Sequence, residues 1–186
     1  MSTFTVVVFF HVLGATALVG HGLASPLVHA AVKRAPTVES LLPWLGYARD
    51  SAKLNPLASL LVLGTGLWLA EGRWGEGWLE VSAGLFVASA VLAMGVVARG
   101  GKQLAAAALA APRGPVPPSL DALRHAAPWN RGADALLANG IALLFLMVNQ
   151  PGLLVSLAVA AGVHGAVLAV RAIAGRKVAV AVAREA

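Results

Sequence analysis

Four histidines lie in segments that contain no Asp, Glu, Lys or Arg, and they are the residues of this chain best suited to chemistry. His11, His21 and His29 belong to the first apolar segment, and His164 belongs to the last. An ionisable side chain inside a membrane segment is costly to place there and therefore marks a functional candidate. A neutral imidazole can ligate a transition metal, or it can hydrogen-bond a carbonyl and simply pack between helices. The residue types leave both interpretations open.

One stripe of the first helix brings small and polar side chains together. An α-helix turns by about 100° per residue, which places His21 roughly 80° around the helix axis from this stripe. We expect the stripe to face other helices, because its glycines would let a neighbouring helix, or the flat face of a macrocycle, approach the backbone closely. Its members are His11, Gly14, Leu18, Gly22, Ser25 and His29. Gly14 and Gly22 are therefore candidates for contact with a cofactor, together with the histidines.

The spacing restricts which histidines could share one ligand. His11 and His29 are separated by about 27 Å along a helix, so they cannot bind one metal ion. His164 lies on a small-residue pattern, Ala158-x3-Gly162-x3-Ala166. Its pairing with His11 or with His21 would need helix tilt to absorb a depth mismatch of about 7 to 8 Å. We expect His29, close to two basic residues, to lie at the interface.

Five apolar segments must position these side chains. None of the 22 acidic and basic residues falls inside them, and 59% of the chain is hydrophobic, above the usual share of a soluble domain. A helix crosses a bilayer with roughly 20 residues, and the sequence Asn149-Gln150-Pro151-Gly152 divides the last apolar region in two. The predicted fold is all-α, a polytopic membrane bundle with a four-helix core and a fifth transmembrane helix. The chain forms one domain with spans at about 4–32, 54–70, 81–98, 135–149 and 153–170, and with an inner loop at 99–134.

The basic residues predict an orientation. Along the chain, Lys and Arg number 0 before the first span, then 4, 1, 5, 0 and 4 in the successive loops and the tail. By the positive-inside rule this places the N-terminus outside and the C-terminus inside, in a multi-pass protein of the inner (cytoplasmic) membrane. Trp74 and Trp78 would then belong to an outer aromatic belt, with Trp44 and Trp129 as inner counterparts. Because no basic residue precedes the long first segment, we expect a membrane helix rather than a cleaved signal.

Several classes of function find no support in the composition. The net charge of +6 is divided among segments on one side instead of forming a basic face with aromatic residues, which argues against nucleic acid as a partner. The chain has no cysteine, and it has no nucleophile elbow, phosphate-binding loop or zinc spacing. Thr65 and Asn139 are isolated polar residues in apolar segments, and we expect both to serve as contacts between helices. The lipid bilayer is the one partner that the sequence predicts directly.

Four short motifs suggest relatives. They are Phe9-Phe10-His11-Val12-Leu13-Gly14, Leu63-Gly64-Thr65-Gly66-Leu67-Trp68-Leu69, Gly77-Trp78-Leu79 and Met147-Val148-Asn149-Gln150-Pro151. With these motifs the chain resembles an uncharacterised family of bacterial integral membrane proteins related to the copper-resistance D proteins and the HemJ-type protoporphyrinogen oxidases. The resemblance extends to about Pro151 and implies a four-helix core in which His11 ligates haem b. Two features of the oxidase branch, an aromatic-Leu-Pro-Arg segment and a lysine near the start of the third span, are absent here.

Three hypotheses of function follow, and whether the protein is an enzyme stays open. The first is a redox or electron-transfer protein that binds haem b, with His11 as axial ligand and His164 or His21 as the second. The second is a copper-related permease with His11 and His164 as metal ligands, although only Met94 and Met147 could add a soft ligand within the spans. The third is a non-enzymatic scaffold that binds a partner membrane protein or forms a homo-oligomer.

Overall fold

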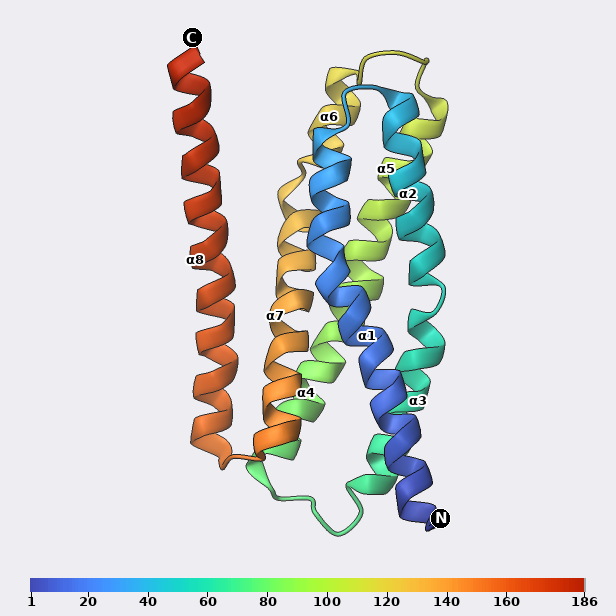
Figure 1. Ribbon diagram of the computed structural model, residues 1–186, viewed down its shortest axis with the longest axis vertical. Helices are drawn as coiled ribbons and strands as arrows, with labels where there is room; N and C mark the ends of the chain where they lie inside the picture. Colours follow the sequence, from blue (N-terminus) through green and yellow to red (C-terminus); the bar gives the residue numbers. More distant parts are fainter. Residues whose placement is uncertain (186) are drawn as a thin grey trace.

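The computed structural model describes residues 1–185, with side chains described up to residue 173, and shows a bundle of long helices (Figure 1). The structure described for this part of the chain contains no β-strand, only an isolated bridge between Thr37 and Pro115. The elements in chain order are α1 (Thr3–Arg34), α2 (Val38–Ala52), α3 (Asn55–Leu69), α4 (Gly77–Leu92), a π-helical turn η1 (Ala93–Val97), α5 (Ala98–Ala110), α6 (Pro118–Arg124), α7 (Ala127–Asn149) and α8 (Leu153–Glu185).

Five stretches of helix are long and apolar enough to cross a membrane, which confirms the predicted fold class. They run through Thr3–Arg34, Val38–Leu69, Gly77–Ala110, Pro118–Asn149 and Leu153–Ile173. Most consist of two or three consecutive helices, and α4, η1 and α5 follow one another without a break. In Figure 1 the N-terminus and the α3–α4 and α7–α8 connections lie at one end, while the α1–α2 and α5–α6 connections lie at the other. Which end faces the cytoplasm stays a prediction from the charges.

The segments that separate the apolar spans are largely helical, including much of 99–134, which the sequence predicted as an inner loop. α2 and most of α5 fall in these segments and extend the bundle beyond the charge-free region. Their charged side chains obscure an amphipathic pattern: Val38, Leu41 and Leu45 recur at helical spacing and are all buried. The charged residues of α2, Glu39, Arg49 and Asp50, are exposed, so water can solvate them.

Local signals fix where these helices begin and end. Thr37 and Ser40 form a capping box that starts α2, with the Ser40 amide donating to Thr37 Oγ1 at 3.3 Å. Pro56 occupies the first turn of α3, as expected from the Asn55-Pro56 pair. α7 ends at Asn149, and the next residue, Gln150, adopts a left-handed conformation with φ of 46° immediately before Pro151. This break separates α7 from α8 and produces the fifth span.

The two ends of the bundle are packed differently. The end formed by α2, α5, α6 and the adjoining parts of α1 and α7 has a conventional apolar core. Its buried members are Val28, Val32, Ala35, Val38, Leu41, Leu45, Leu104, Ala108, Leu120 and Trp129. In the charge-free part, many of the buried residues are small, among them Gly14, Ala58, Ala138 and Ala142, and large apolar side chains point outward. This pattern is typical of helices surrounded by lipid, where outward apolar side chains carry no penalty.

The fifth long helix stands at the side of the bundle. α8 packs against α7 and α4, whereas α1 packs against α3, α7 and α2 (Figure 1). The start of α8 lies very close to α4. A Cβ atom added at Gly77 would lie only 2.5 Å from the Leu153 backbone, so the absence of a side chain at Gly77 permits this approach. Up to residue 173, most of the other residues of α8 are exposed.

Candidate functional site

His11 is held at the contact between α1 and α3. Its Nδ1 lies 3.0 Å from Thr65 Oγ1, and Thr65 Oγ1 donates its own proton to the Leu61 carbonyl at 2.5 Å. Because that hydroxyl proton is used, Oγ1 accepts from Nδ1–H, and the lone pair of the neutral ring is on Nε2. Gly66 makes room for the ring, since a Cβ there would lie 3.2 Å from His11 Cε1. Thr65 is thus the helix contact that the sequence predicted, and it also orients His11.

The small-residue stripe of α1 faces the other helices, as predicted. Every member of it is buried or half-buried. Residues of α3 occupy the space beside Gly14, since a Cβ added at Gly14 would lie 2.9 Å from Val62 Cγ2 and 3.1 Å from the Ala58 carbonyl oxygen. The glycine therefore serves the close approach of two helices, and no open face remains there for a macrocycle. Around Gly22, no atom would lie within 4 Å of an added Cβ.

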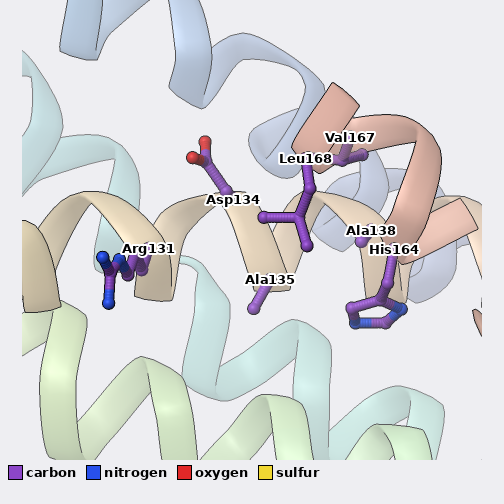
Figure 2. A pocket seen from close by; sticks show the side chains of 7 residues that line it. All are labelled: Arg131, Asp134, Ala135, Ala138, His164, Val167 and Leu168. Atoms are coloured by element: carbon purple, nitrogen blue, oxygen red, sulfur yellow. The ribbon is translucent and has the colours of Figure 1, made fainter. Parts of the chain in front are cut away.

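His21 and His164 each line a separate small cavity. The cavity beside His21 has a volume of about 230 Å³ and is bounded by Tyr47, Ser51 and Asn55 of α2 and α3. The cavity beside His164 has a volume of about 210 Å³ and lies between α7 and α8 (Figure 2). His164 Nδ1 lies 2.8 Å from the Ala160 carbonyl of its own helix and donates to it, which leaves Nε2 as the acceptor.

His29 is buried and stacked on Trp129, so both rings pack inside the bundle, while their depth in the membrane stays a prediction. The ring centroids are 4.2 Å apart with an interplanar angle of 21°. Gly100 of α5 allows this arrangement, because a Cβ there would lie 2.8 Å from Trp129 Cδ1. Trp78 is also buried, and its Nε1 donates to Glu76 at 2.7 Å. Two of the four tryptophans assigned to aromatic belts are therefore core residues.

The four histidines do not converge. His11 lies between α1 and α3, His21 beside α2 and α3, His29 against Trp129 of α7, and His164 between α8 and α7. Within the described part of the chain, no group of three or more His, Asp or Glu side chains could hold a metal ion. His11 has the oriented ring that an axial ligand requires, but His11 and His164 belong to different helix pairs. Both cavities are smaller than a typical cofactor pocket of about 300–1,000 Å³. The arrangement thus fits one imidazole ligand and does not fit a haem held by two histidines.

Asp134 belongs to a charged cluster that was not predicted from the sequence. Its Oδ1 accepts from Arg171 Nε at 2.8 Å and from Nη2 at 2.5 Å, which joins α7 to α8. Lys33 of α1 lies within electrostatic range of both residues. Lys33, Asp134 and Arg171 are each the first charged residue beyond an apolar segment, so they lie at a similar depth. That position was the feature of the sequence that could have predicted the cluster.

The fold and these contacts define a polytopic helical membrane protein in which several polar side chains join helices. A family model described as "Predicted integral membrane protein (DUF2269)" matches residues 5–151, and the chain belongs to this family. The match ends where α7 meets α8, so the fifth span lies outside it, as the sequence motifs indicated. No curated protein and no solved structure matches the chain. None of these comparisons connects it to the copper-resistance D proteins or the HemJ-type oxidases.

Proposed function

We propose that the protein is a non-enzymatic membrane scaffold that pairs with a second copy of itself through α8. One observation carries the proposal: the small-residue pattern Ala158, Gly162 and Ala166 lies on the exposed side of α8. No atom would lie within 4 Å of a Cβ added at Gly162 or Gly165. The side of α8 toward the bundle instead carries the buried Ser156 and the half-buried His164.

A second copy is the occupant that this surface suits best. Small residues four apart let two membrane helices approach until their backbones touch, and the gain comes from close packing. The same surface on two chains is self-complementary, so a two-fold pair needs no other protein. In the described part of the chain α8 packs mainly against α7 and α4, and the side that carries Ala158, Gly162 and Ala166 is exposed.

The internal polar contacts support a structural function. His11 hydrogen-bonds Thr65 across α1 and α3, and Asn139 Nδ2 donates to Ser89 Oγ at 2.9 Å across α7 and α4. Hydrogen bonds of this kind hold membrane helices together at about 1 kcal/mol each.

Because the chain contains no cysteine, single cysteines can test the pairing directly. Gly162→Cys, oxidised in native membranes, should give a disulfide-linked dimer. The matched control is Leu157→Cys, since Leu157 is 50% exposed and lies roughly 140° around the helix from Gly162. A monomer for both variants, or equal crosslinking of both, would contradict the proposal. Gly162→Leu should in addition convert a dimer in mild detergent to a monomer.

Haem b binding at His11 alone is the second candidate function. The hydrogen bond from Nδ1 to Thr65 favours it, because metal-ligating histidines usually donate their other N–H and so fix the ring. An absorbance spectrum of protein from haem-replete cells tests this candidate. A Soret band that shifts on reduction and is absent in His11→Ala would support it, and a colourless protein would reject it. Metal analysis of the same two proteins tests the copper alternative.

A further inference from the structure

The cavity between α7 and α8 has the composition of a site for an amphiphilic anion. Arg131 and Asp134 lie toward one end of it, and His164 lies toward the other (Figure 2). Ala135 and Ala138 of α7 and Leu168 of α8 supply apolar walls. Its volume is about 210 Å³, enough for a small head group or the first part of a chain.

Positive charge prevails at the polar end. Asp134 accepts from Arg171 Nε and Nη2, so the charge of its carboxylate is largely compensated. In the part of the chain that the structure describes, Arg131 has no ion pair within 4 Å. Lys33 lies within electrostatic range of Asp134 and Arg171 and adds a further positive charge to this end of the cavity. A guanidinium binds phosphate oxygens with paired, charge-assisted hydrogen bonds.

The depth of the cavity matches the boundary of the apolar region. Asp134 is the residue before the charge-free segment 135–149, and Arg171 is the residue after the segment 153–170. The polar end therefore lies at head-group level and the apolar walls lie where acyl chains begin. The sequence predicts that this is the cytoplasmic side, where anionic lipids bind basic pockets between membrane helices.

The cavity is also accessible from the lipid. α8 stands at the side of the bundle (Figure 1), and Leu168 at the wall of the cavity is 63% exposed. An occupant could therefore enter laterally between α7 and α8. A soluble anion would gain nothing from the apolar walls, whereas a lipid would bury its first methylene groups there.

We propose that this cavity binds the phosphate group of an anionic phospholipid, with Arg131 of its lining on the phosphate oxygens and Ala135 and Leu168 beside the acyl chain. Arg171 does not line the cavity, but it is bonded to Asp134 of the lining and adds positive charge there. The site lies on the side of α8 opposite to Ala158, Gly162 and Ala166, so it does not depend on the proposed pairing of two copies. The bound lipid would connect α8 to the family core that ends at Pro151.

Native mass spectrometry and thermal unfolding in nanodiscs test this site. The full chain should retain phosphatidylglycerol in preference to phosphatidylcholine, and its unfolding temperature should be higher in discs that contain phosphatidylglycerol. Arg131→Gln should weaken retention about tenfold, as expected for the loss of a charge-assisted hydrogen bond. The matched control is Arg113→Gln, because Arg113 is an exposed cation between α5 and α6.

A variant with the opposite sign separates binding from general damage. Asp134→Asn removes the carboxylate that engages Arg171, so it should increase lipid retention even though it removes an ion pair. Equal retention in Arg131→Gln and the control, or reduced retention in Asp134→Asn, would overturn the proposal. Inorganic phosphate added to detergent-solubilised protein should leave the unfolding temperature unchanged. Stabilisation by phosphate that equals the effect of the lipid would assign the site to a soluble anion instead.

Discussion

Replacing Arg124 with alanine should destabilise the charged end of the bundle, because this side chain hydrogen-bonds carbonyl groups at the C-terminal end of α1. Arg124 is 9% exposed, and its Nη1 donates to the Val32 carbonyl at 3.2 Å and to the Ala35 carbonyl at 2.6 Å. The last carbonyls of a helix have no partners within the helix, and Val32 and Ala35 are both buried. The guanidinium thus satisfies two acceptors that water does not reach.

The magnitude follows from these two hydrogen bonds. A bond from a charged donor contributes about 1.5–3 kcal/mol, and a buried acceptor left without a partner costs a similar amount, so the loss should total about 3–5 kcal/mol. The ion pair with Asp121 adds little, since that carboxylate is 47% exposed. Alanine and arginine have similar helix propensities, so α6 itself should not change. The unfolding temperature should fall by about 6–20 °C for a chain of this length.

Thermal unfolding in a mild detergent, followed by circular dichroism, measures this effect. Arg113→Ala serves as the control, because it removes an exposed arginine from the same end of the bundle and should change the unfolding temperature little. Arg124→Lys should give an intermediate loss, since an ammonium keeps the charge but lacks the planar fork. If Arg124→Ala unfolds at the same temperature as the control, the closure of α1 by this arginine does not stabilise the fold.

Two further predictions concern the membrane part and the α3–α4 hairpin. Gly14→Leu should lower the free energy of unfolding by about 1–3 kcal/mol, because the larger side chain forces α1 away from α3. Gly20→Leu should be tolerated, because no atom lies within 4 Å of a Cβ added there. Chemical unfolding of both variants measures the difference, and equal stability would contradict the close packing at Gly14. In the hairpin, hydrogen bonds from Arg73 and then Trp78 hold the pKa of Glu76 below its usual value. The order that Glu76 gives the hairpin should therefore be complete above the usual pKa of about 4.3 and be lost as the pH falls through the lowered value. Trp78 fluorescence follows this transition, and its persistence in Glu76→Gln would show that another group is responsible.

The membrane architecture could be read from the sequence because it depends on a local property. Fixed charges are excluded from apolar segments of about 20 residues, and the break at Gln150-Pro151 is encoded by four consecutive residues. The helices α2 and α5 were harder to recognise, since their charges resemble those of loops. Their buried residues recur at helical spacing, as Leu104 and Ala108 do, but this pattern is informative only when the partner helix is known.

The histidines illustrate what the sequence could not predict, which is the identity of their contact partners. The sequence placed His11 and Gly14 on a stripe that faces other helices, and the structure agrees. It could not show that Val62 and Ala58 fill the space beside Gly14, or that Thr65 orients His11. These partners come from residues more than 40 positions away along the chain. His29 was assigned to the interface because of the nearby charges, and its stacking on Trp129 depends on a residue 100 positions later.

By itself the sequence determined the number of membrane helices, their approximate limits and the side chains that can carry chemistry, because each depends on the free energy of transferring a short segment from water into lipid. The tertiary structure decided which side chains meet: His11 with Thr65, and Asp134 with Arg171. In lipid every helix has an equally apolar surface, so hydropathy does not select neighbours. Shape at glycines and a few polar contacts make that selection.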